Sequence, residues 1–129
     1  MKLLSVFFLL FFTISFPAIS NGSSKIEYIV ESAKNGNADA QFKLAEMYKN
    51  GVDIEQDNSQ SLFWYEKSAK NGNADAQAIM GLVYYFGVGS YDIDIKRAYA
   101  WASVSAKQGR ENSNEVAEGY ADDLNEQEL

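Results

Sequence analysis

One ten-residue block occurs twice in this chain without a single change. Residues 32–41 and 68–77 both read Ser-Ala-Lys-Asn-Gly-Asn-Ala-Asp-Ala-Gln, and a shorter third copy ends at Gly109. The step from Gly36 to Gly72 is 36 residues, and the step from Gly72 to Gly109 is 37. Self-similarity at this period is typical of stacked-repeat proteins, in which each unit buries its apolar face against its neighbours.

Each repeat unit carries the signals of two helices. In the first unit, apolar residues recur at helical spacing after Asn37, a good N-cap residue, until Gly51 stops the helix. A second helix follows Asp57 and ends before Gly72, and residues 73–109 repeat the same plan. No segment after the N-terminal region alternates as a strand does, so the pattern predicts an all-α chain.

The two ends of the repeat array differ from its centre. Residues 26–36 read as a lone helix, the second half of a repeat whose first half is absent. Near the C-terminus, Val116, Tyr120 and Leu124 form an apolar stripe on an otherwise acidic helix, which favours a capping helix. The predicted domain therefore covers residues 25–129: a half-repeat, two full antiparallel helix pairs and a cap, preceded by a flexible leader at 21–24.

The first twenty residues have the layout of a secretory signal peptide. Lys2 precedes an uncharged apolar run from Leu3 to Phe16, and small residues then lead to a predicted cleavage site between Ser20 and Asn21. A retained membrane anchor is the alternative, but the run is shorter than the ~20 apolar residues that span a bilayer. We therefore expect residues 1–20 to be removed, a periplasmic or secreted location, and no membrane insertion afterwards.

Composition narrows the function classes further. The net charge is −7 and becomes −8 on loss of Lys2, so nucleic acids and anionic lipids are disfavoured as partners. The chain has no cysteine and no histidine, which excludes Ser-His-Asp and Cys-His triads and Cys/His zinc sites. We expect no cofactor and no metal. Carboxylates are abundant, and they keep a carboxylate-dependent hydrolase open as an alternative.

The repeat resembles the Sel1-like repeat, a relative of the tetratricopeptide repeat. The matching positions of the second unit are Ala69, Gly72, Ala76, Gln77, Met80, Gly81, Tyr84, Gly87, Asp94, Ala98 and Trp101. Those of the first unit are Ala33, Gly36, Ala40, Gln41, Leu44, Tyr48, Gly51, Asp57 and Trp64. The chain departs from the pattern at Ala45 and at Asp53, which stands where the second unit has Gly89. Aspartate tolerates the left-handed conformation, so the loop is still expected to form.

The resemblance implies a right-handed α-solenoid that serves as a protein-interaction scaffold. The resemblance also implies one of the roles of exported bacterial members of this family. These roles are envelope assembly, host interaction and the neutralisation of toxic effectors by cognate immunity proteins. Cysteine-rich relatives linked to β-lactam binding offer no parallel, because this chain has no cysteine.

A comparison of the two units predicts where a partner binds. Four positions on the first helix are polar in unit one and apolar in unit two. They are Lys43, Glu46, Lys49 and Asn50 in unit one, and Ile79, Leu82, Tyr85 and Phe86 in unit two. Because unit one folds without apolar groups there, the four residues of unit two are interpreted as a partner-binding patch, with Lys43, Glu46 and Lys49 as its polar rim. The alternative is that the cap helix covers them.

Three hypotheses about function follow. The first is an adaptor that binds a protein partner in its concave groove, such as an envelope component, a host factor or a cognate toxic effector. The second is a hydrolase that acts on envelope polymer or lipid with carboxylates alone. The third is self-association as a homodimer, because a short solenoid leaves terminal surface available.

Overall fold

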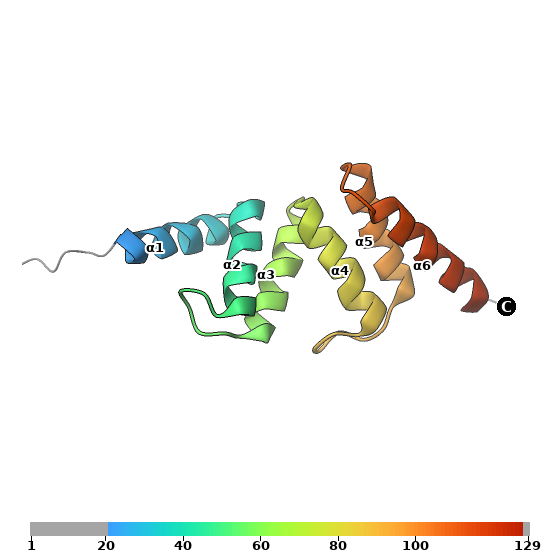
Figure 1. Cartoon of the computed structure of the whole chain (residues 1–129), viewed down its shortest axis with the longest axis horizontal. Coiled ribbons are helices and arrows are strands. Elements are labelled where there is room, and N and C mark those ends of the chain that lie inside the picture. The colour runs from blue at the N-terminus through green and yellow to red at the C-terminus, as the bar shows by residue number, and fades with distance from the viewer. Residues whose placement is uncertain (1–20, 128–129) are drawn as a thin grey trace, which may run out of the picture.

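The structure is a computed structural model that describes residues 21–127, and every regular element in this part is an α-helix. The helices are α1 (Asn21–Lys34), α2 (Ala38–Asn50), α3 (Asn58–Lys70), α4 (Ala74–Phe86), α5 (Ile95–Lys107) and α6 (Ser113–Gln127). Each helix packs against the one before and the one after, so the chain advances along a single axis (Figure 1). This order confirms the predicted α-solenoid: a half-repeat (α1), two helix pairs (α2–α3 and α4–α5) and a cap (α6).

The N-terminal predictions meet the structure only in part. The predicted signal peptide, residues 1–20, lies outside the described residues. Helix α1 begins at Asn21, so residues 21–24, predicted to be a flexible leader, form its first turn. Within residues 21–127, no helix combines the length and the apolar character needed to cross a membrane.

Local sequence chemistry accounts for the helix ends. Asn37 and Asn73 cap α2 and α4, each accepting a backbone N–H three residues further on at 2.8 and 2.9 Å. Helix α2 stops at Gly51 in the left-handed conformation. In the following loop Asp53 adopts φ 63°, close to the 66° of its counterpart Gly89, which confirms that aspartate can replace glycine there.

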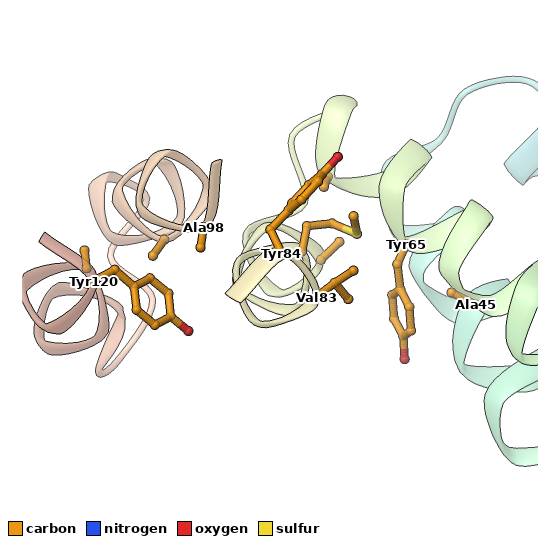
Figure 2. Packing of buried hydrophobic residues seen from close by; sticks show 11 residues of the cluster. Ala45, Tyr65, Val83, Tyr84, Ala98 and Tyr120 are labelled. Atoms are coloured by element: carbon orange, nitrogen blue, oxygen red, sulfur yellow. The ribbon is translucent and has the colours of Figure 1, made fainter. Parts of the chain in front are cut away.

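The core runs through the middle of the array in two clusters. Ile29, Leu44 and Met47 belong to the smaller cluster, which joins α1 and α2. The larger cluster extends from α2 to α6, and Figure 2 shows its side chains filling the space between the helices. Leu44 and its counterpart Met80 are 1% and 0% exposed, so the same position is buried in both units.

The repeated decapeptide forms a hydrogen-bonded joint between successive units. Gln77, buried in α4, donates to the carbonyl of Ala69 at 3.2 Å and accepts from Gln108 at 2.6 Å. Gln41 repeats both bonds one unit earlier, with Ala33 and Asn71. Because these buried amides are satisfied only when the helices meet in this register, the joint explains why the block is retained without change.

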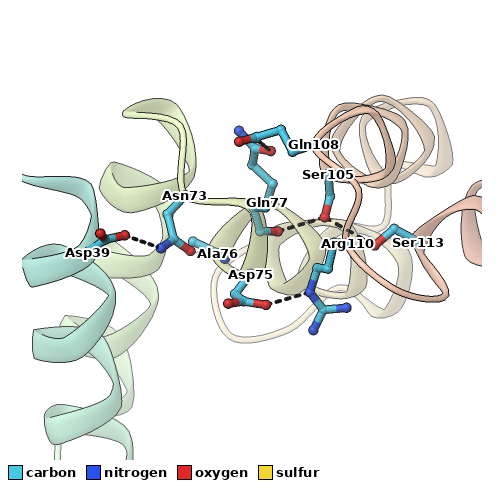
Figure 3. Close-up of polar contacts among 10 residues, drawn as sticks. Asp39, Asn73, Asp75, Ala76, Gln77, Ser105, Gln108, Arg110 and Ser113 are labelled. Carbon is cyan, nitrogen blue, oxygen red and sulfur yellow. Dashed lines mark hydrogen bonds and ion pairs between the residues drawn. The ribbon is translucent and has the colours of Figure 1, made fainter.

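A second set of bonds crosses the same joint (Figure 3). Ser105 donates to the carbonyl of Ala74 at 2.7 Å, as Ser68 does to Ala38 one unit earlier. Asn73 donates to Asp39 at 2.9 Å, and at the next joint the Arg110 guanidinium pairs with Asp75 at 2.7 Å. The second joint therefore keeps the bonding plan even though the third copy of the block, which supplies part of it, has changed in sequence.

Candidate functional site

The four predicted partner-binding residues lie along α4. Leu82 and Phe86 are exposed, with 45% and 64% of their surface open to solvent. Ile79 and Tyr85 are half-buried and pack against the larger core cluster. The patch is therefore divided into two exposed side chains and two that also contribute to the core.

Tyr85 is the member that the cap helix holds. Its ring stacks on Tyr120 of α6 with centroids 4.4 Å apart, and its hydroxyl donates to a carboxylate oxygen of Asp123 at 2.7 Å. This hydrogen bond raises the pKa of Tyr85, so the phenol stays neutral and able to donate. Phe86 meets Tyr85 edge-on at 4.9 Å and lies outside this contact. The cap thus covers part of Tyr85 but leaves Leu82 and Phe86 open.

A hollow of about 90 Å³ opens beside the patch, between α4, α5 and α6. Its apolar wall comes from all three helices, and its polar edge comes from the α5–α6 connection and the start of α6. The lining residues are Ala78, Ile79, Leu82, Ala102, Arg110, Asn112, Ser113 and Val116.

The hollow exists because unit two lacks two aromatic rings. In unit one, Phe42 of α2 and Tyr65 of α3 pack edge-on, with centroids 5.7 Å apart. Their counterparts after the repeat steps of 36 and 37 residues are Ala78 and Ala102, which line the hollow. The sequence prediction missed this feature because it compared positions on one helix only. The paired Phe/Ala and Tyr/Ala differences were the available signal.

The predicted polar rim lies on α2 and lines no part of this hollow. Glu46 accepts a hydrogen bond from Tyr65 and lies 3.7 Å from the Lys49 ammonium. Lys43 lines a different depression, between α1 and α2, next to Tyr28. The structure therefore places the three rim residues on α2, outside the lining of the hollow.

Acidic side chains are abundant on α6, the helix that contributes Ser113 and Val116 to the hollow. Helix α6 contains five carboxylates and no lysine or arginine between Ser113 and Gln127. Its acidic residues are Glu115, Glu118, Asp122, Asp123 and Glu126. Four of the five are exposed, and the fifth is the Asp123 that binds Tyr85.

Glu66 shows how a carboxylate in this fold is used for a structural contact. Glu66 on α3 lies 2.6 Å from the Lys70 ammonium and accepts from the Tyr91 hydroxyl at 2.7 Å. The hydrogen bond from Lys70 lowers the pKa of Glu66 against the opposing effect of burial, so this carboxyl is a charged acceptor. Across residues 21–127, no three histidine, cysteine or acidic residues converge as metal ligands.

Comparison with solved structures identifies two similar solenoids. The crystal structure of a Sel1 repeat protein from Oxalobacter formigenes is 27% identical, with a TM-score of 0.69, and the match covers 74% of this chain and 71% of that one. A protective antigen present in uropathogenic Escherichia coli strains, which displays an SLR fold, is 28% identical with a TM-score of 0.61. That match covers 72% of this chain but only 20% of the antigen.

Comparison with models of protein families shows which family the chain belongs to. No curated protein has a significant match to the chain. The Sel1 repeat model, however, matches residues 38–73 and 74–109, more than half of the 129 residues. The two matches coincide with the helix pairs α2–α3 and α4–α5. The chain therefore belongs to the Sel1 repeat family.

Proposed function

We propose that this protein is an exported adaptor whose protein partner binds on α4 and the adjoining hollow. Sel1 repeat proteins generally act as scaffolds for protein–protein interactions and are typically non-catalytic. The proposed site has Leu82 and Phe86 as its exposed anchors. Ile79 and Tyr85 support them from the core side.

One observation carries this proposal: α4 exposes two large apolar side chains where α2 has polar ones. Leu82 and Phe86 replace Glu46 and Asn50, and they are 45% and 64% exposed. The repeat folds with either set, so folding does not require apolar groups at these positions. Exposed apolar groups that folding does not require are typical of an interaction site.

The export part of the proposal depends on the layout of residues 1–20. A signal peptide there would deliver the domain to the periplasm or the exterior, where an envelope component, a host factor or a toxic effector can be its partner. One of the similar solenoids is a protective antigen of uropathogenic E. coli strains, which supports a host-facing role among these three. Mass analysis of the protein from the exported fraction should show Asn21 as the first residue.

A crosslinking experiment tests the binding site. A photoreactive amino acid at position 86 should give a covalent adduct with the native partner, whereas the same group at the matched position 50 should give none. Phe86→Ala should then weaken binding by about 2 kcal/mol, as interface anchors commonly do, while Asn50→Ala leaves affinity unchanged. Equal adducts from both positions, or unchanged affinity in Phe86→Ala, would place the interface elsewhere.

A turnover assay separates this proposal from the hydrolase. The adaptor predicts no chemistry when purified protein is incubated with envelope polymer or lipid. Measurable hydrolysis that disappears on replacement of a single acid by its amide would favour the hydrolase instead.

A further inference from the structure

We propose that the partner segment is cationic and amphipathic. It inserts one aliphatic side chain into the hollow between α4, α5 and α6, and it places lysine or arginine residues against the acidic side of α6. This inference rests on the proposed function, because it names the chemistry of the partner that the adaptor binds.

The size and walls of the hollow select an aliphatic group. Its volume is about 90 Å³, smaller than the ~150 Å³ apolar cavity that takes up benzene. Ala78 and Ala102 replace rings, and Ile79, Leu82 and Val116 complete an apolar wall. A branched aliphatic side chain would restore the contacts that Phe42 and Tyr65 make in unit one. Removal of this apolar surface from water is the expected source of affinity.

The negative charge of α6, beside the hollow, selects a cationic flank on the partner. Val116, Tyr120 and Asp123 turn toward α4, as their contacts show. Exposed Glu115 and Asp122 lie in the neighbouring row of the helix, seven residues apart. Electrostatic complementarity steers association and suppresses partners of like charge, so basic residues on the partner fit this acidic side of α6.

Neither Arg110 nor Lys43 of the predicted rim cancels this acidic character. Arg110 at the edge of the hollow is paired with Asp75 at 2.7 Å. Lys43 lies toward α1, beside a different depression. A second copy of the chain is a poor occupant, because two proteins with a net charge of −7, or −8 after loss of Lys2, repel each other and would bring like charges to the acidic side of α6.

Three synthetic helical peptides provide the probes. The first carries leucine at helical spacing with lysine flanks, the second has glutamate for lysine, and the third has serine for leucine. Binding to the purified protein is measured by fluorescence anisotropy. The lysine–leucine peptide should bind at least about tenfold more tightly than either twin, and its advantage over the glutamate twin should shrink with added salt.

Two matched variants assign the two parts of the interaction. Ala78→Phe gives α4 the ring that α2 carries as Phe42, so it should fill the hollow, keep the fold and weaken binding about tenfold. Glu115→Lys combined with Asp122→Lys should abolish the preference for lysine over glutamate. Glu31→Lys, an exposed acid on α1, is the control and should change neither. If Ala78→Phe does not fold, Leu82→Ser tests the same apolar wall.

The outcomes separate this inference from the proposed function. Equal affinity for the lysine and glutamate peptides, or unchanged affinity in the variants that alter the apolar wall, overturns the inference. In that case crosslinking from position 86 to the native partner still supports the adaptor. Peptide binding without any such crosslink contradicts the adaptor itself, because the surface then binds cationic helices but not the native partner.

Discussion

The helix pairs α2–α3 and α4–α5 share a framework and differ in the surface that they build on it. Both begin at a capping asparagine, bury a glutamine in the joint and place a large apolar residue at the same buried position. They differ where Phe42 and Tyr65 give way to Ala78 and Ala102. In the pair α2–α3 the two aromatic rings pack together, whereas the pair α4–α5 leaves a hollow beside the cap helix.

This difference shows how a repeat protein acquires a site without changing its fold. The polar framework residues satisfy buried backbone and amide groups, and truncation of one of them removes a hydrogen-bond partner from such a group. Residues outside the framework are under no such constraint and can be exchanged between polar and apolar types. The candidate functional residues are therefore those that differ between equivalent positions of the two units. Variants at shared and at differing positions test whether the two units have the same framework.

Truncation of the shared core should have the largest effect. Leu44→Ala and Met80→Ala should each lower the free energy of unfolding by about 2–5 kcal/mol, because both side chains are fully enclosed. Urea denaturation of the two variants measures the losses side by side. A much smaller loss for Met80→Ala would mean that unit two is loosely packed, and the equivalence of the two cores would be wrong.

Removal of a buried glutamine should have the second-largest effect on stability. Gln41→Ala and Gln77→Ala each remove the side-chain donor to a helix-end carbonyl and the acceptor of a neighbouring amide, that of Asn71 or Gln108, at a cost of about 1–3 kcal/mol. Thermal denaturation should show similar losses for both, since the two joints have the same bonds. The exposed Asn50→Ala variant is the control and should lie within about 0.5 kcal/mol of the parent. Losses confined to one joint would break the comparison.

The contact between α4 and the cap helix should contribute less. Tyr85→Ala removes the stack on Tyr120 and should cost about 0.5–1.5 kcal/mol beyond the lost apolar area. Phe86→Ala, at an exposed position, should leave the thermal midpoint nearly unchanged. Hydrogen exchange should show faster opening of α6 in the Tyr85 variant alone. Similar melting of both variants well below the parent would show that Phe86 is also part of the core.

The smallest expected effect concerns acid stability. Lys70 lowers the folded pKa of Glu66 below its ordinary value of 4.5, so the pair stabilises the fold above that pH. This contribution is lost as the pH falls through the lower folded pKa. At this partly exposed pair it should not exceed about 1 kcal/mol. The counterpart of Glu66 in α5 is Ser103, which has no charge to titrate.

Glu66→Gln provides the measurement for that pair. Its urea-unfolding free energy should fall less between neutral pH and pH 3 than that of the parent. The difference should disappear in high salt, because exposed ion pairs are screened. An identical pH dependence for parent and variant would assign the acid sensitivity to other carboxylates.

The sequence alone determined the helix pairs, their boundaries and their order. Apolar spacing, the capping residues Asn37 and Asn73, and the repeated block are local signals, and each has one structural solution within a short segment. The fit of Asp53 into a left-handed loop position was predictable for the same reason. Only the start of α1 was misjudged, because polar residues 21–24 give no strong signal for either helix or coil.

Tertiary structure alone decided which members of the apolar patch face solvent. Sequence placed Ile79, Leu82, Tyr85 and Phe86 on one helix, but burial depends on where α6 docks. That docking is set by contacts across 35 or more residues, such as Tyr85 with Tyr120 and Asp123. The hollow arises from the same cause, since a missing ring leaves space only where three helices meet. Such contacts depend on the relative positions of several helices, and a local sequence pattern does not specify those positions.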